Sequence, residues 1–321
     1  MYHFKDGILY RKSFTEPYLR CVGPTQAKEI IQEMHEGVCS IHSGYRTIVN
    51  RIKRMGYFWP HMYRDTYDLI VNCEACQIHA PINRTPRRNM VPIHAAWPFC
   101  KWGIDIVGPF PRGVENVKFL FVAIDYFTKW VEARLLSTIT GRKILTFVWE
   151  DIICHFGLPR EIVNYNGTQF ANNPFKDWYI DMDIQHSFTS VAYSQAKAQV
   201  EVTNRDIVAG IKARLGKHRQ GWVDELQHVL WAHRTTLKDS TNETPFSLVY
   251  GTKAVIPAEV LVPTKRITTF DEQQNDEALR ENLDALEERR TLAHIWQAKK
   301  KQKIANHYDK KVKRWTFSYM T

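Results

Sequence analysis

The spacing of apolar residues changes along the chain, and each change predicts a different kind of structure. Residues 1–20 hold two short apolar stretches that flank Asp6-Gly7, a strong two-residue turn signal, so a hairpin is expected there. Residues 25–80 are expected to be helical, and they are rich in cysteine and histidine. Residues 81–98 are rich in proline and arginine, which is typical of a linker.

A strand-rich pattern begins at Trp102. The stretches GIDIV, VKFLFVAIDYF and WVEARLL predict three consecutive strands, and residues 141–157 predict an amphipathic helix that ends at a Gly-Leu-Pro stop. The pattern that follows predicts, in order, a strand at 160–164, a helix at about 174–181, a strand in IQHSF, a long helix at 197–215 and a helix at about 221–238. Strands in a row, followed by alternating strands and helices, indicate a mixed α/β layer.

Residues 271–308 contain neither glycine nor proline, and we expect them to form one long helix. The helix is acidic from Asp271 to Glu288, and its end is basic, with Lys299, Lys300, Lys301 and Lys303. A solvated helical linker is the preferred interpretation of this charge pattern. The alternative, more specific interpretation is that the basic end is an arm that contacts nucleic-acid phosphates.

Composition narrows the choice of partner. With 321 residues, 44% of them hydrophobic, the chain is long enough for two or three domains and at least one large core. The formal net charge of +10 favours a polyanionic partner, most simply nucleic acid. No apolar run approaches the roughly 18–20 residues that span a bilayer, so no membrane partner is expected.

Four residues have the types and spacing of a metal site. Six residues separate His35 from His42, two separate Cys73 from Cys76, and thirty lie between the pairs. Two imidazoles and two thiolates suit a tetrahedral zinc ion, and four protein ligands leave no open position for water, so this zinc would be structural. Cys39 lies between the histidines and is a possible substitute ligand.

Two carboxylates lie in otherwise apolar patterns. Asp105 lies inside the strand WGIDIVGPF, where burying a carboxylate costs free energy unless it is hydrogen-bonded or binds a cation. A cation-binding role is one interpretation of Asp105, and capping of a neighbouring turn is the alternative. Glu201 lies beside the apolar stripe of the helix AQVEVTNRDIVAGIKARL, and a surface ion pair with Arg205 is its alternative. Asp125, at the end of another strand, is a weaker acidic candidate.

Besides the His-His-Cys-Cys block, the chain contains the stretches WGIDIVGP, VAIDYFTKWVEA, FGLPREIV, NGTQF, QVEVTNR and TPFSLVYGTKAVIPAE. Together these features resemble the integrase of Ty3/gypsy-type LTR retrotransposons of the kind common in plants. The resemblance implies a zinc-binding N-terminal domain and an RNase H-like integrase core. It also implies three acidic residues that hold two Mg²⁺ or Mn²⁺ ions for DNA 3′-processing and strand transfer. DNA as the partner, homo-oligomers and a nuclear location follow from the same resemblance.

Carried over position by position, the resemblance assigns the first acid to Asp105 and the third to Glu201. The second acid of the family precedes an Asn-Gly pair, and this chain has Tyr165 there, with the family's 35 residues between Tyr165 and Glu201. Tyrosine is neutral near pH 7, with a reference pKa of about 10, and it is longer than aspartate. Catalysis by this chain is therefore expected to be impaired.

The loop before Glu201 also departs from the family pattern, His-Pro-Gln-Ala-Asn-Gly-Gln. Tyr193 stands for histidine, Ser194 for proline, Lys197 for asparagine and Ala198 for glycine. Lys197 adds a positive charge where DNA would lie, so Lys197 and Arg205 are the residues assigned to nucleic-acid binding.

The patterns and the resemblance divide the chain into five segments: a hairpin extension (1–24), a zinc-binding domain (25–80), a linker (81–98), an RNase H-like core (99–260) and a helical linker (261–321) towards a missing C-terminal domain. Three functions remain open. The chain is an active integrase, a non-catalytic DNA-binding remnant or co-opted protein with the same fold, or a zinc-stapled interaction module.

Overall fold

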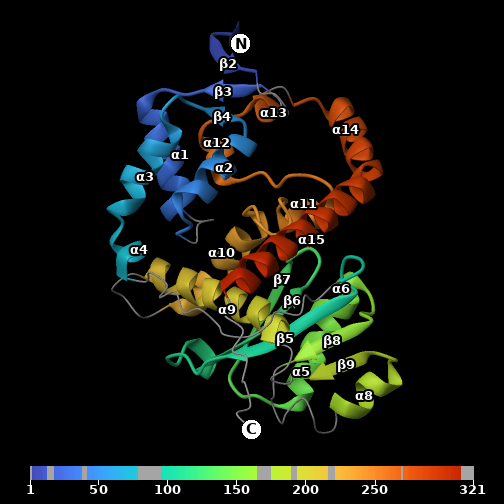
Figure 1. Cartoon of the computed structure of the whole chain (residues 1–321). Helices are drawn as coiled ribbons and strands as arrows, with labels where there is room; N and C mark the ends of the chain where they lie inside the picture. Colours follow the sequence, from blue (N-terminus) through green and yellow to red (C-terminus); the bar gives the residue numbers. More distant parts are fainter. Residues whose placement is uncertain are drawn as a thin grey trace, which may run out of the picture.

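The computed structural model describes residues 2–12, 18–37, 42–78, 95–164, 175–188, 194–215, 221–268 and 270–311. They form two main bodies, which we call the N-terminal unit (residues 2–78) and the core unit (residues 95–250), joined further by helices from the end of the chain (Figure 1). In this described part, no helix is both long and apolar enough to cross a membrane.

The N-terminal unit combines a small sheet with four helices. The predicted hairpin is confirmed: β1 (Tyr2–Lys5) and β2 (Ile8–Arg11) pair antiparallel around Asp6 and Gly7, whose φ angles of 52° and 76° suit a tight turn. The sheet continues through β3 (Leu19–Cys21) to β4 (Tyr57–Phe58). The helices are α1 (Pro24–Glu36), α2 (Tyr45–Arg54), α3 (Met62–Val71) and α4 (Glu74–Ile78).

The hydrophobic core of the N-terminal unit contains residues from far along the sequence. Ile256, Ala258 and Val262, in and around α12 (Pro257–Leu261), are buried among the apolar residues of α1, α2 and β4. The hydroxyl of Tyr57 in β4 donates to backbone carbonyls of the same segment. The segment after the core unit therefore completes the N-terminal unit, and the predicted boundary at residue 260 lies inside α12.

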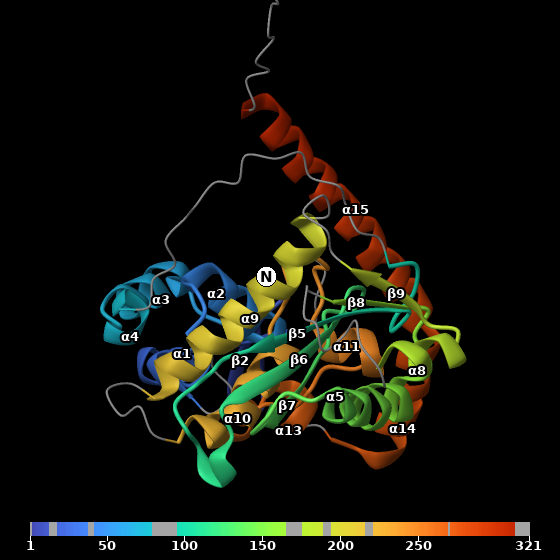
Figure 2. The same ribbon diagram turned by 90° about the horizontal axis from the view of Figure 1, so that it is seen from below.

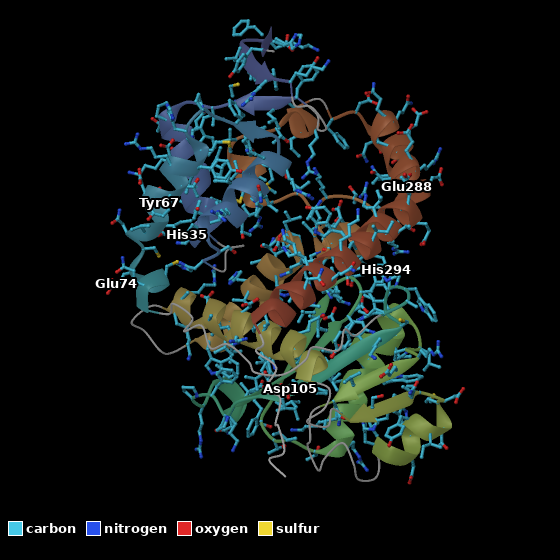
Figure 3. The ribbon with its side chains drawn as sticks, in the orientation of Figure 1. His35, Tyr67, Glu74, Asp105, Glu288 and His294 are labelled. Atoms are coloured by element: carbon cyan, nitrogen blue, oxygen red, sulfur yellow. The ribbon has the colours of Figure 1, made fainter. Side chains whose placement is uncertain are left out.

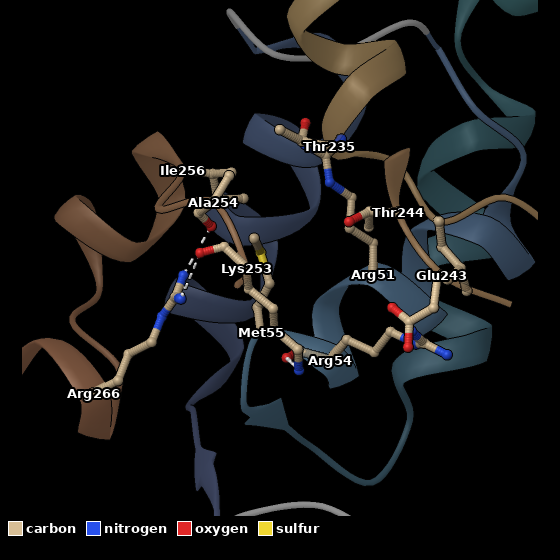
Figure 4. Close-up of a pocket in the computed structure, with 11 residues that line it drawn as sticks. Arg51, Arg54, Met55, Thr235, Glu243, Thr244, Lys253, Ala254, Ile256 and Arg266 are labelled. Carbon is tan, nitrogen blue, oxygen red and sulfur yellow. Dashed lines mark hydrogen bonds and ion pairs between the residues drawn. The ribbon is translucent and has the colours of Figure 1, made fainter. Parts of the chain in front are cut away.

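Arginines of α2 line a small pocket at the junction of the two units (Figure 4). Arg51 donates to the hydroxyls of Thr235 and Thr236, and Arg54 forms an ion pair with Glu243 at 3.7 Å. Polar contacts thus tie the N-terminal unit to the core unit.

The core unit is built on a five-stranded sheet in the order β7-β6-β5-β8-β9. Its strands are β5 (Lys101–Val107), β6 (Phe119–Asp125), β7 (Val131–Leu136), β8 (Glu161–Asn164) and β9 (Gln185–Phe188). The first three pair antiparallel, whereas β8 and β9 run parallel to the central strand β5. All five strands were predicted from the sequence.

Strand β6 shows why both faces of this sheet are covered. Leu120, Val122 and Ile124 point to one face, and Phe121 and Ala123 point to the other, as the two-residue period requires. The first face packs against α9 (Ser194–Leu215) and α10 (Trp222–Thr235). The second face packs against α5 (Gly141–Phe147) and α8 (Phe175–Asp181). Helix α5 continues as a π-helix (Val148–Ile153) that leads into α6 (Cys154–Phe156), and this continuation packs on the same face. The predicted mixed α/β layer is confirmed.

The last helical region differs from its prediction in two ways. It is interrupted at Ala285, which separates α14 (Glu272–Asp284) from α15 (Leu286–Lys311). The first half of α15 also packs on the core unit rather than lying in solvent, because Leu286, Ala293 and Gln297 are buried on one side. Short helices α11 (Pro245–Tyr250) and α13 (Lys265–Thr268) precede this region, and α15 contacts α11. The preferred solvated linker is therefore wrong for this half of the helix.

Candidate metal centre and catalytic face

The four residues of the predicted zinc site come together in the N-terminal unit. His35 is fully buried in the last turn of α1, His42 precedes α2, and Cys73 and Cys76 lie just before and within α4. Their candidate ligand atoms all lie within 4.8 Å of one another. In the described part of the chain, no other group of three or more His, Cys, Asp or Glu side chains converges in this way.

The distances in this group fit a tetrahedral zinc ion. The Cys76 sulfur lies 3.3 Å from Nε2 of His35 and 3.7 Å from Nδ1 of His42. The Cys73 sulfur lies 3.4 Å from the same Nδ1 atom of His42. In a tetrahedral zinc site, the zinc–sulfur bond is about 2.3 Å and the zinc–nitrogen bond about 2.0 Å. A sulfur ligand and a nitrogen ligand of the same ion are then about 3.5 Å apart. The donor set and its spacing therefore match structural zinc. Cys39, the possible substitute, lies outside the described residues.

The surroundings keep His35 in the form that binds metal. Burial, with a smaller effect of His42, lowers the pKa of His35 to about 4, so its imidazole is neutral at physiological pH. Burial and the neighbouring Cys73 raise the pKa of Cys76 to about 12 in the metal-free chain. Zinc binding would therefore displace a thiol proton, which couples metal affinity to pH.

A hydrogen bond joins Gly37, the residue that follows α1, to the core unit. Arg214, near the end of α9, donates to the carbonyl oxygen of Gly37 at 2.7 Å and forms an ion pair with Glu225 of α10. Gly37 follows His35 by two residues. Arg214 thus links the end of α1, which carries His35, to α9 and α10.

Asp105 lies far from this centre, on the face of β5 that is covered by α9 (Figure 3). Its carboxylate accepts a hydrogen bond of 2.7 Å from Asn204 of α9. Asn204 is 8% exposed, and its side-chain oxygen is buried with no hydrogen-bond partner among the described residues. Sequence reasoning missed Asn204, although its position three residues after Glu201 places both on one side of the helix.

Gly103 explains how α9 comes so close to β5. A Cβ atom at this position would lie 2.5 Å from the side chain of Val200 and 2.9 Å from that of Tyr126. Only glycine therefore lets the helix pack at this distance, and the same approach brings Asn204 to Asp105.

Gly103→Ala is expected to destabilise the chain by about 1–3 kcal/mol, because the added methyl group forces α9 away from the sheet. Urea unfolding measures the change. Gly23→Ala is the matched control, because a Cβ atom there would meet nothing within 4 Å. Equal stability of the two variants would contradict this packing.

The other predicted site residues are placed as follows. Glu201 and Arg205 are exposed, one turn apart on α9. Lys197 lies in the first turn of the same helix, and its side chain is outside the described part. Strand β8 ends at Asn164, which pairs with Ile104, the neighbour of Asp105. Tyr165 follows Asn164 in sequence and is itself outside the described residues.

Asp125, the weaker candidate, has a structural role. It is fully buried and accepts hydrogen bonds from the backbone and hydroxyl of Thr128 and from the backbone of Phe99. It therefore caps the turn between β6 and β7. Its hydrogen bonds account for a buried carboxylate without a metal.

Among the described residues of the core unit, no group of three or more acids converges to hold divalent cations. Such a site needs several anionic oxygens to hold ions about 3.5–4 Å apart. Asp105 and Glu201 are the only predicted carboxylates on this face, and in the described part no third acid joins them.

Two family models match the chain. Residues 22–82 match the integrase zinc binding domain, and residues 96–194 match the integrase core domain. The chain is 25% identical over 260 residues to the Transposon Tf2-3 and Tf2-4 polyproteins of Schizosaccharomyces pombe. These matches cover 80% of this chain and 19% of each polyprotein, so the chain spans about a fifth of the length of these relatives.

Solved structures also resemble the chain. The simian T-cell lymphotropic virus intasome in complex with a PP2A regulatory subunit has 18% identity and a TM-score of 0.48, covering 77% of this chain and 78% of that chain. The HTLV-2 integrase catalytic core domain in complex with magnesium, in its trimeric form, has 19% identity and a TM-score of 0.39, covering 48% of this chain and 98% of that chain.

Proposed function

This chain is an integrase-type retrotransposon protein, and from that premise we propose that it binds DNA while its strand-transfer chemistry is impaired. The reaction proposed for an intact site is 3′-processing followed by strand transfer. Asp105 and Glu201 would help to hold the divalent metal ions, which would supply the charge needed to activate water or a DNA 3′-hydroxyl for attack on a phosphodiester.

One observation carries the proposal: the position that the family motif gives to its second acid holds Tyr165, so Asp105 and Glu201 are the two acids that remain. Asn204 donates to the Asp105 carboxylate, and Gly103 lets α9, the helix that carries Asn204 and Glu201, pack closely on β5. These contacts support a site on this side of β5. A phenol that is neutral near pH 7 does not replace the charge of a carboxylate.

The remaining features support a role on DNA. The net charge of +10 suits a polyanion, and Lys197 and Arg205 are the residues proposed to contact it near Glu201. We also propose, on the family resemblance alone, that the chain self-associates on DNA and acts in the nucleus. The zinc centre would stabilise the N-terminal unit and take no part in the chemistry.

DNA affinity is expected to fall steeply as salt rises, because each phosphate contact releases counterions. Between 50 and 200 mM salt, about five or more contacts would weaken binding by about 100-fold or more. Fluorescence anisotropy with a labelled duplex measures this dependence. Binding that is absent, or that ignores salt, would contradict the DNA role and favour the zinc-stapled interaction module.

A second candidate function is that of a fully active integrase. It rests on the intact Asp105, Glu201 and zinc constellation. Efficient strand transfer by the unmodified chain with Mn²⁺ and oligonucleotide substrates would favour it and remove the proposed impairment.

A further inference from the structure

Helix α3 carries an open side with two tyrosines. Tyr63, Tyr67 and Val71 follow one another at intervals of four residues, which places them on one side of the helix, and each is between 45% and 49% exposed. Met62 and Thr66, which precede the two tyrosines, are buried, so α3 has one packed side and one open side. Two views show α3 at the outer edge of the N-terminal unit, away from the core sheet (Figures 1 and 2).

Helix α2 runs antiparallel to α3 and extends this surface. The ring of Tyr45, the first residue of α2, meets the ring of Tyr67 edge to face, with their centroids 5.4 Å apart. Near the other end of α2, the ammonium nitrogen of Lys53 lies 4.7 Å from the centre of the Tyr63 ring. Three aromatic rings from two helices thus lie on one outer surface, which we call the tyrosine surface (Tyr45, Tyr63 and Tyr67).

The cations of the tyrosine surface come from α2. The sequence of this helix, YRTIVNRIKR, contains four basic residues and no acid. Two of them, Arg51 and Arg54, contact the core unit. Arg46 donates from Nε to the hydroxyl of Tyr45 at 3.0 Å, and its guanidinium carbon lies 5.6 Å from the centre of the same ring. With Lys53 at the other end, each end of the tyrosine surface has a cation beside a ring.

The acids of α3 have other partners. Asp65 accepts a hydrogen bond of 2.8 Å from the indole of Trp59, and Asp68 forms an ion pair with Arg64 at 3.8 Å. The cations of α2 therefore dominate the charge at the tyrosine surface. A polyanionic partner is favoured there over a cationic one.

Exposed rings beside cations suit a strand of unpaired bases. A base stacks on an aromatic ring through its face, and a neighbouring cation can bind the phosphate backbone of the same strand. Inside a duplex, stacked base pairs cover those faces, so the rings would gain little from double-stranded DNA. An acidic peptide would use the cations but would not need the rings. Single exposed aromatic residues need no explanation, whereas three on one surface indicate a binding site.

We propose that the tyrosine surface binds single-stranded nucleic acid, with bases stacked on Tyr63 and Tyr67 and phosphates bound by Arg46 and Lys53. The site lies in the N-terminal unit, whereas the proposed catalytic acids belong to the core unit. The inference therefore goes beyond the proposed duplex binding and metal chemistry and does not depend on either. Single-stranded DNA and RNA share the chemistry that this surface recognises.

Fluorescence anisotropy of the zinc-bound full chain with oligothymidylate and oligouridylate of about 10 nucleotides tests the site. Tyr67→Leu is expected to weaken single-strand binding by about tenfold and duplex binding by about twofold or less. Tyr67→Phe keeps the ring and should bind the single strand as the unmodified chain does. Tyr2→Leu is the matched control, because it makes the same change at an exposed tyrosine of the hairpin. A loss with either oligonucleotide supports the site, and comparison of the two distinguishes DNA from RNA.

Arg46→Gln tests the charges separately from the rings. Arg46 is exposed, and its replacement is expected to reduce the salt slope of single-strand binding by about 0.7, because one fewer phosphate is neutralised. Tyr67→Leu should leave that slope unchanged, since stacking releases no counterions. Thermal unfolding and zinc content show whether each variant keeps the N-terminal unit folded. Arg46→Gln remains a test of the site even if Tyr67→Leu unfolds this unit.

Several results would overturn the single-strand site. They are an unchanged single-strand affinity in folded Tyr67→Leu, equal losses in Tyr67→Leu and Tyr2→Leu, and an unchanged salt slope in Arg46→Gln. Poly-glutamate that binds as tightly as the oligonucleotides would also overturn it, in favour of an acidic protein partner. Duplex binding that persists in any of these cases would leave the proposed function intact, whereas a chain that binds neither single strands nor duplex would overturn both.

Discussion

Removal of zinc is expected to unfold the N-terminal unit and to release a segment that lies more than 170 residues further along the chain. Structural zinc contributes on the order of 10 kcal/mol in zinc-finger peptides, and a zinc ion bound by the four converging ligands would hold α1 to α4. Since Ile256, Ala258 and Val262 are buried in the same hydrophobic cluster, α12 should lose protection together with α1. Amide exchange in both helices is expected to accelerate by about 100-fold or more.

Strands β5 and β6 provide the internal reference for this experiment. Their buried residues belong to clusters that contain no residue of the N-terminal unit, so their exchange should change little. Cys76→Ala is expected to reproduce the effect of chelation. Cys154→Ala, which removes an exposed thiol outside the site, should not. Unchanged exchange in α12 after chelation would contradict the shared core, and a chain without stoichiometric zinc would contradict the metal centre.

The sequence predicted the elements of the core unit because their patterns are local. The alternation of Phe121 and Val122 identifies a strand buried on both sides, and Asp6-Gly7 identifies a hairpin without reference to distant residues. The zinc ligands were also predictable, because two short spacings and four ligand types restrict the chemistry. The geometry of the four side chains agrees with that prediction.

The contacts that join distant segments could not be predicted in this way. The spacing of apolar residues in 256–262 does not indicate that this segment packs against α1. The helix break at Ala285 has no glycine or proline that would have predicted it. The docking of α15 depends on Gln297, a polar residue whose burial is determined by the carbonyl of Phe127. Such contacts are specified by tertiary structure, and single-sequence patterns do not record them.

Tyr165→Asp is expected to increase metal-dependent strand transfer by about 100-fold or more, because it restores the anionic ligand that the family resemblance assigns to this position together with Asp105 and Glu201. β8 pairs with β5 up to Asn164, the residue before Tyr165 in the sequence, and Asn204 donates to the Asp105 carboxylate. Tyr165→Asn is the matched control, since it has the size of aspartate without its charge. DNA affinity of both variants should stay near that of the unmodified chain, so the gain would lie in the chemical step.

The most direct test of the central claim is the strand-transfer rate of the unmodified chain, Tyr165→Asp and Tyr165→Asn on oligonucleotide substrates with Mn²⁺. The proposed impairment predicts background rates for the unmodified chain and Tyr165→Asn, and clear activity for Tyr165→Asp that is lost again when Glu201→Gln is added. Clear activity of the unmodified chain, or equal rates for Tyr165→Asp and Tyr165→Asn, would contradict it.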